Sequence, residues 1–183
     1  LGVGVAGGCE AAIHAARRFI TFMGKEQTLV KLDFKNAFNS IHRDIMLDCV
    51  ASKIPELYKF CHLAYGTPTS LQFGDGVIWS TEGVQQGDPM GPLLFCLVLH
   101  PILISLKSSF KIGFMDDVTL GGDISCVAND VEQMSAQGIM VGLELNHAKC
   151  ELVHSSLKVD EMLNSSHSKS YAIVHQCSDL SLL

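Results

Sequence analysis

The residues of this chain that could do chemistry are three aspartates in two strand-like segments. Asp116 and Asp117 are adjacent at the tip of a predicted β-hairpin over residues 110–120, and Asp33 ends a predicted strand over residues 28–34. Crowded carboxylates repel one another, so such a cluster normally needs a cation to neutralise it. If the two segments meet, the aspartates form an all-oxygen site suited to Mg²⁺ and to two-metal phosphoryl transfer. Taken alone, an Asp-Asp pair is also typical of a solvated turn.

The composition predicts a folded domain, and the net charge leaves two explanations for its partners. The chain has 183 residues, of which 48% are hydrophobic and 17% charged, enough apolar content to bury one core. Its net charge is −6, whereas proteins that bind phosphate backbones usually carry a basic surface. Either nucleic acid is not the partner, or the basic elements lie outside this chain.

Cysteine usage and hydropathy indicate a compartment and argue against a membrane partner. The seven cysteines are scattered without a C-x-x-C pair, which suits a reducing, intracellular compartment. No basic segment followed by an apolar one stands near Leu1, so no signal peptide is expected. The longest apolar run, Met90 to Leu106, contains two prolines and is shorter than the roughly 20 residues that span a bilayer. We expect it to be a buried helix.

The remaining chain alternates predicted helices and strands, and hairpins interrupt the alternation. Asn39 or Ser40 can cap a helix, Pro55 can start one, and Gly74 to Gly76 can form a hairpin turn. The predicted helices cover residues 10–23, 39–51, 55–64, 90–106 and 125–138; the other predicted strands cover residues 69–73, 77–81, 141–145 and 150–154. Gly121 and Gly122 are expected to end the Asp-Asp hairpin. The pattern favours an α+β fold, with helices on one face of a mostly antiparallel sheet.

Two further patterns carry weaker hypotheses. Residues 2–7 match the pattern G-x-G-x-x-G and precede a predicted helix, and Glu26 follows at about the sequence spacing expected for a ribose-binding acid. These two features indicate dinucleotide binding as an alternative function. No strand precedes the glycines, which argues against that alternative. His147, Cys150 and His154 are spaced like metal ligands, but without a fourth ligand we interpret them as a coincidence.

Four segments that follow one another along the chain strengthen the interpretation of the aspartates as a functional site. They are Lys31-Leu-Asp-Phe-Lys-Asn-Ala-Phe-Asn-Ser40, Gly83-Val-Gln-Gln-Gly-Asp-Pro-Met-Gly-Pro92, the Phe-Met-Asp-Asp hairpin, and Gly142-Leu-Glu-Leu-Asn-His-Ala-Lys-Cys-Glu-Leu152. Each is weak alone. Together they resemble motifs A, B, C and D of reverse transcriptases, most closely those of non-long-terminal-repeat retrotransposons and their domesticated relatives. The resemblance runs from about Leu1 to Leu152.

The resemblance implies a fold and an activity. The fold would be a polymerase palm, α+β, with a ferredoxin-like antiparallel sheet backed by helices, partial fingers and no thumb. Residues 1–154 would form this palm and residues 155–183 a loose or truncated polar tail. The activity would be RNA-directed DNA polymerase: a primer 3′-hydroxyl attacks the α-phosphate of a dNTP on an RNA template. The alternative is an inactive remnant, or a nucleic-acid-binding module of the same fold.

The resemblance also implies a metal site. Asp33 and Asp116 would hold two Mg²⁺ ions, for which Mn²⁺ can substitute, with Asp117 close by and less directly involved. The backbone carbonyl of Phe34 would also face a metal. Lys149 would be a general acid toward pyrophosphate, although a solvated surface lysine explains it equally well.

The nucleotide-binding residues follow from the same resemblance. Phe38 would be the aromatic gate that rejects a ribose 2′-hydroxyl, and Gln86 and Gly87 would lie against the incoming nucleotide and template. Phe38 could instead be a packing residue, and Gln86-Gly87 a plain turn. Arg17 and Arg18 could touch nucleic acid, but an arginine pair on a helix usually faces solvent.

The resemblance leaves two family elements without a counterpart here. The basic finger strands would precede Leu1 and the thumb would follow the motif D region. We therefore expect that these segments belong to a longer parent protein, which would explain the −6 charge. The expected location is intracellular, and for a retroelement protein this includes the nucleus.

Overall fold

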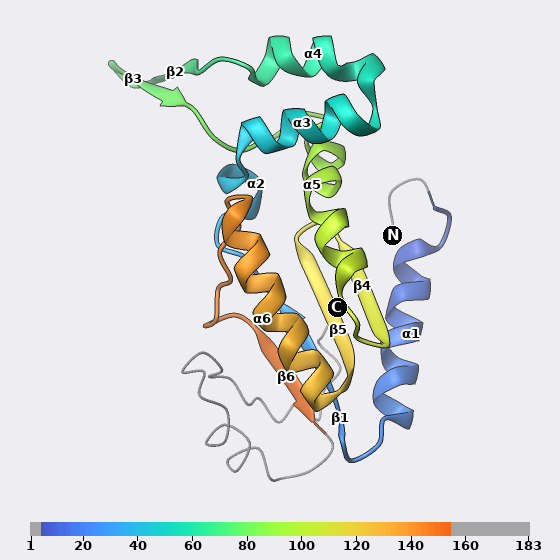
Figure 1. The fold of residues 1–183 in the computed structure, drawn as a ribbon. Helices are drawn as coiled ribbons and strands as arrows, with labels where there is room; N and C mark the ends of the chain where they lie inside the picture. Colours follow the sequence, from blue (N-terminus) through green and yellow to red (C-terminus); the bar gives the residue numbers. More distant parts are fainter. Residues whose placement is uncertain (1–4, 155–183) are drawn as a thin grey trace. The chain divides into compact units, whose positions relative to one another are not determined.

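The computed structural model describes residues 5–154 (Figure 1). These residues form two compact units. Within these residues the first unit comprises 5–34, 106–134 and 145–154, and the second comprises 35–105 and 135–144. The predicted tail from residue 155, and the start of the G-x-G-x-x-G pattern, lie outside the described residues. The division into a palm and a tail therefore stays a prediction.

The first unit is built around a four-stranded sheet. Its strands are β1 (Gln27–Leu32), β4 (Phe110–Phe114), β5 (Asp117–Asp123) and β6 (Glu151–His154). They lie in the order β4-β5-β1-β6, and every neighbouring pair is antiparallel. This order, with strands β4 and β5 joined as a hairpin, is that of the ferredoxin-like split βαβ arrangement. The predicted α+β fold with an antiparallel sheet is confirmed.

Apolar side chains of the sheet and of two helices form the core of this unit. Helix α1 (Gly8–Phe22) buries the small residues Ala12 and Ala16, and its Phe19 ring lies 5.1 Å from that of Phe110 on β4. Further buried side chains come from the sheet and from helix α6 (Ile124–Met140), among them Leu32, Val118, Leu120, Val127, Val131 and Met134. The predicted helix over residues 125–138 is thus confirmed.

Two predictions about this region are wrong. Gly121 and Gly122 do not end the hairpin: they lie within β5, opposite Leu29 and Thr28, because β5 continues to pair with the whole of β1. Residues 141–145 form no regular strand. Instead they close the C-terminal end of α6, where the N–H groups of residues 141 and 143 both donate to the Gly138 carbonyl, at 3.0 and 2.8 Å.

The second unit is mostly helical. It contains α2 (Ala37–Ser40), α3 (Arg43–Lys53), α4 (Pro55–Tyr65) and α5 (Gly91–Ser105), together with a hairpin of β2 (Thr69–Phe73) and β3 (Gly76–Ser80). Helix α5, which covers the longest apolar run, buries Leu94, Phe95, Val98, Leu99 and Ile102, whereas Leu93 and Ile104 are exposed. No helix among residues 5–154 is long and apolar enough to cross a membrane.

The predicted single helix from residue 39 is wrong, because two helices replace it. Helix α2 ends at Ser40, and α3 begins after His42, which makes no side-chain capping bond. The Ser40 hydroxyl does not cap the following helix either. It donates backwards, to the carbonyl of Asn36 at 3.0 Å. This use of Ser40 within α2 is why it cannot cap α3.

The β2–β3 hairpin is exposed on both faces. Its large apolar side chains are between 47% and 72% exposed: Leu71, Phe73, Val77, Ile78 and Trp79. A two-stranded hairpin is only marginally stable by itself, so contacts at its base are important for holding it.

A buried carboxylate joins α6 to the segment before β4 in the first unit. Asp130 is 2% exposed, and its oxygens accept hydrogen bonds from the N–H groups of Lys107 and Ser108 and from the Ser108 hydroxyl, at 2.6–3.0 Å. Burial raises the pKa of Asp130, but these hydrogen bonds outweigh it, so the pKa lies below its ordinary value. The ionised carboxylate therefore stabilises the fold.

The first prediction concerns this carboxylate. Asp130→Asn should lower the free energy of unfolding by about 1–3 kcal/mol at neutral pH, because an amide cannot accept all the hydrogen bonds. A lowered pKa gives stability that is present above the unfolded value of about 3.9 and is lost as pH falls through the folded pKa. Urea unfolding of both proteins should therefore show a gap that narrows below about pH 4. The exposed Asp123→Asn is the control, and equal stability of Asp130→Asn and wild type at pH 7 would contradict the assignment.

Candidate active site

Strand register brings the three aspartates to one end of the sheet. Leu32, the last residue of β1, pairs with Val118 of the antiparallel strand β5. Asp33 and Asp117 are each the next residue beyond that pair, at the same end. Asp116 precedes Asp117 in the turn that joins β4 to β5. The sequence placed these residues on separate segments, and the pairing of β1 with β5 makes the segments neighbours.

The turn that carries Asp116 has an unusual backbone. It contains two residues, Met115 and Asp116, between the paired residues Phe114 and Asp117. Met115 has φ 53°, in a region that non-glycine residues seldom occupy. The favoured two-residue hairpin turns require a positive φ at their first central position, where glycine, asparagine or aspartate usually stands. The methionine therefore holds backbone strain beside the aspartates.

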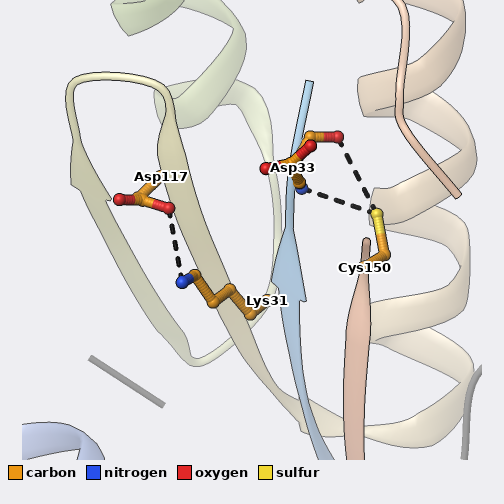
Figure 2. Close-up of polar contacts among 4 residues, drawn as sticks. All are labelled: Lys31, Asp33, Asp117 and Cys150. Carbon is orange, nitrogen blue, oxygen red and sulfur yellow. Dashed lines mark hydrogen bonds and ion pairs between the residues drawn. The ribbon is translucent and has the colours of Figure 1, made fainter. Parts of the chain in front are cut away.

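Lys31 lies on the same side of the sheet as this cluster. Side chains two residues apart on a strand share a face, so Lys31 accompanies Asp33. Its Nζ is 3.5 Å from Oδ1 of Asp117, whose side chain is 50% exposed. Figure 2 shows Asp33 beyond the end of β1, between this ion pair and Cys150. Like charges opposite each other on neighbouring strands destabilise a sheet, and the lysine offsets part of that cost.

Asp116 has the most perturbed environment of the three carboxylates. Burial raises the pKa of Asp116, and the negative charges of Asp117 and Asp33 raise it further. A backbone hydrogen bond and the positive charge of Lys31 act in the opposite direction and do not cancel the rise. The ionised form of Asp116 is therefore disfavoured unless a cation is nearby.

The backbone of Asp33 is held, whereas its side chain is not. Its carbonyl accepts the Asn146 N–H at 2.8 Å, and its own N–H points to the Cys150 sulfur at 3.5 Å. Burial raises the pKa of the Cys150 thiol, so the thiol keeps its proton beside the Asp33 carbonyl. The carboxylate oxygen Oδ1 of Asp33 is buried and has no hydrogen-bond partner among residues 5–154. Such an oxygen is costly without a partner.

These observations define what the site can hold. An unpartnered buried oxygen on Asp33 and a disfavoured charge on Asp116 both fit a hard divalent cation, which binds oxygen ligands. Within residues 5–154, no three His, Cys, Asp or Glu side chains are grouped so that they could hold a metal ion. The aspartates therefore supply suitable donors, but not a closed set of ligands in this conformation.

The predicted nucleotide-binding residues lie in the second unit. The Phe38 ring stacks on that of the fully buried Phe95, with centroids 4.6 Å apart and planes at 16°, and Phe38 remains partly exposed. The carbonyl of Phe38 accepts the Val84 N–H at 2.8 Å. Gly83 has φ 69°, and a Cβ there would collide with the backbone of Asn39. Phe38 and the loop that leads to Gln86 are thus joined closely.

Gln86 and Gly87 occupy the exposed tip of that loop. The Asp88 N–H donates to the Gln85 carbonyl at 3.1 Å, which makes residues 85–88 a β-turn with Gln86 and Gly87 in its centre. Gly87 has φ 89°, as the third residue of a type II turn requires, and a Cβ added to it would meet no atom within 4 Å. A ligand could therefore approach the backbone closely here.

The remaining predicted residues are exposed. Lys149 belongs to the first unit, as the aspartates do, and stands directly before Cys150, the residue that contacts Asp33. Arg17 and Arg18 are exposed on α1, where the Arg18 guanidinium lies 5.6 Å above the Phe22 ring. Their roles, and that of the Phe34 carbonyl, stay predictions.

Two contacts of the site are missed by sequence reasoning. Lys31 could have been found, because strand alternation places it on the face of Asp33. Cys150 could not, because its contact with Asp33 depends on how the chain turns after Asn146. The sequence spacing groups Cys150 only with His147 and His154; in the structure His154 instead lies 2.8 Å from the Gln27 carbonyl.

Comparison with known proteins identifies sequences similar to this one. A family model described as reverse transcriptase (RNA-dependent DNA polymerase) matches residues 8–173. The SLACS retrotransposable element 132 kDa protein of Trypanosoma brucei gambiense is 32% identical over 152 residues, which is 75% of this chain and 13% of that protein. The Pol polyprotein of the Drosophila melanogaster type-2 element R2DM is 32% identical over 142 residues, 67% of this chain and 13% of that protein. This chain therefore spans about an eighth of the length of these two relatives.

Solved structures with the same fold come from telomerases. The chain matches a telomerase of Candida tropicalis in complex with a fragment of telomeric RNA, with a TM-score of 0.61 and 12% identity over 82% of this chain and 30% of that one. A Candida albicans telomerase gives a TM-score of 0.60 at 13% identity, over 81% of this chain and 30% of that one. At this identity the likeness concerns the fold, which is the palm. With the family model covering most of its length, the chain belongs to the reverse transcriptase (RNA-dependent DNA polymerase) family.

Proposed function

We propose that this chain is the catalytic palm of a retroelement RNA-directed DNA polymerase that extends a primer with dNTPs on an RNA template. The observation that carries the proposal is the meeting of Asp33, Asp116 and Asp117 at one end of the antiparallel sheet. Family membership supports the type of reaction. Because the relatives are much longer, template and primer would also be bound by other parts of a parent protein.

The aspartates would be the ligands of divalent cations. Asp33 and Asp116 would each give carboxylate oxygens, with Asp117 and the Phe34 carbonyl beside them. Mg²⁺ ions bound there would supply the positive charge that lowers the pKa of a primer 3′-hydroxyl and stabilises the transferring phosphate. Such cations would give Asp33 Oδ1 a partner and would favour the ionised form of Asp116.

Other residues would select and orient the nucleotide. The exposed part of the Phe38 ring would exclude a 2′-hydroxyl, because its stacking on Phe95 leaves it little room to move. The turn at Gln86 and Gly87 would present backbone to the nucleotide and template. Lys149 would give a proton to the leaving pyrophosphate.

The second prediction tests the cation site without any reaction. In metal-free buffer the free energy of unfolding of Asp116→Asn should equal that of the wild type or exceed it by up to about 1 kcal/mol, because the substitution removes a disfavoured charge. Mg²⁺ or Mn²⁺ should raise the melting temperature of the wild type and not that of the variant. Asp75→Asn, in the β2–β3 turn, is the matched control and should keep the metal response. An equal response of wild type and Asp116→Asn would argue against the site.

The third prediction concerns catalysis. Primer extension on an RNA template with dNTPs and Mg²⁺ should fall at least about 10²-fold in Asp116→Asn. The assay should be run on this chain and on a chimera in which its residues 8–154 replace the matching segment of an active retroelement polymerase. Activity retained in the Asp116→Asn chimera would exclude the proposed mechanism. A chimera that is inactive even with all three aspartates would instead favour the inactive-remnant alternative.

The fourth prediction separates the two interpretations of Phe38. If the ring is a gate, Phe38→Val should raise the kcat/KM for ribonucleotides relative to deoxynucleotides by roughly 10- to 200-fold. If Phe38 only packs on Phe95, the variant should lose stability while this ratio stays constant. Single-nucleotide incorporation by the chimera, with matched ribonucleotide and deoxynucleotide pairs, measures the ratio directly.

A further inference from the structure

A buried tyrosine holds the turn at Gln86 and Gly87 from behind. Tyr65, the last residue of α4, is 3% exposed. Its hydroxyl accepts the Gln85 N–H at 3.2 Å and donates to Oδ2 of Asp88. Gln85 and Asp88 are the first and last residues of the β-turn. One hydroxyl therefore bonds to both ends of the turn that presents Gln86 and Gly87.

Asp88 also makes hydrogen bonds to the residues that follow the turn. Its other carboxylate oxygen, Oδ1, accepts the Met90 N–H at 2.8 Å. Its backbone carbonyl accepts the N–H of Gly91, the first residue of α5, at 2.9 Å. The turn is thus joined to α4 through Tyr65 and to α5 through Asp88. Burial, together with the hydrogen bond to Asp88, raises the pKa of Tyr65 to about 12, so the hydroxyl keeps the proton that it donates.

Arg43 fixes the approach to the same turn. Its guanidinium is 5.2 Å from the Tyr65 ring centroid, and the residue is 7% exposed. It donates to the Gly83 carbonyl at 2.8 Å and to the Ser80 carbonyl and hydroxyl at 2.8 and 2.7 Å. One planar cation thereby joins the end of β3, the start of the loop and the tyrosine. This use of a fixed fork of donors is specific to arginine.

We infer that Tyr65 is a positioning residue for nucleotide binding: with Arg43 and Asp88 behind it, its hydroxyl holds the Gln85–Asp88 turn in the conformation that receives the incoming nucleotide. The inference rests on the proposed function, and it goes further by assigning a role to Tyr65 and Arg43, which lie outside the four motif segments on which the resemblance rests. Gln86 and Gly87 are exposed, and a Cβ added to Gly87 would meet no described atom within 4 Å, so the hydrogen bonds at the two ends of the turn are what fix its conformation.

The fifth prediction uses Tyr65→Phe, which keeps the buried ring and removes only the hydroxyl. Amide hydrogen exchange in the segment 85–91 should become about three- to tenfold faster, since the Gln85 N–H loses its acceptor and Asp88 loses a donor. Segments in α3, and in α5 beyond Gly91, should exchange at the wild-type rate. The control is Tyr58→Phe, on the same helix, where the ring packs on His62 at 5.6 Å; it should leave the exchange of 85–91 unchanged.

Kinetics of the chimera connect the turn to the nucleotide. Tyr65→Phe should raise the KM for dNTP about three- to tenfold while kcat changes little, because the turn must be ordered when nucleotide binds. A purely structural role would lower the amount of active enzyme, and with it the apparent kcat, without moving KM. Tyr58→Phe should show neither effect.

Each result decides the inference. Unchanged exchange of residues 85–91 in Tyr65→Phe would overturn the positioning role, whatever the kinetics show. Faster exchange with an unchanged KM for dNTP would overturn its link to the nucleotide. If the wild-type chimera does not extend primers at all, the proposed function fails and the link to the nucleotide fails with it, and the exchange experiment still decides whether Tyr65 holds the turn.

Discussion

The antiparallel register between β1 and β5 is the constraint on which the candidate site depends. Side chains on a strand alternate between two faces, so a shift of one residue in this pairing would turn Asp33 and Lys31 together away from Asp117. The pairing is held by buried residues on both strands, with Leu32 opposite Val118 and Val30 opposite Leu120. The packing of the apolar core therefore fixes the position of the aspartates, and a substitution in the core that altered the register would also displace them.

Several features at this end of the sheet lower the stability of the fold. Asp33 has an unpartnered buried oxygen, Asp116 resists ionisation, and Met115 adopts a strained backbone. Lys31 offsets only part of this, through a pair with an exposed Asp117. Features that cost stability and gather in one place are typical of functional sites. Asp130, in the same unit, shows the contrast: its charge is fully satisfied, and its pKa lies below the ordinary value.

Much of this arrangement could be predicted from the sequence, because it follows from local patterns. The apolar strand before Asp33, the turn residues of the β2–β3 hairpin and the apolar run of α5 each carry their own signal. The errors lie where another hydrogen bond overrides such a signal. Gly121 looks like the end of a strand, yet β1 extends the pairing past it. Ser40 looks like a helix cap, yet it bonds backwards within α2.

What the sequence could not show are contacts between distant residues that share no motif. Tyr65 and Asp88 are 23 positions apart, and Asp33 and Cys150 are 117 apart. Neither Tyr65 nor Arg43 carries a pattern that marks it as part of a turn. Their partners became visible only once the helices were placed, because a buried polar group must find its hydrogen bonds wherever the fold provides them.

The exposed hairpin of β2 and β3 has a consequence for handling the chain in solution. Within the described residues each of its strands has one open edge, and both faces carry apolar side chains. Open edges of this kind pair with other copies and seed aggregates. The net charge of −6 opposes such association by repulsion, which salt weakens. Concentrated samples should therefore be kept at low ionic strength, and a lysine placed on an outward position of β2 or β3 would be the first change to make for a well-behaved preparation.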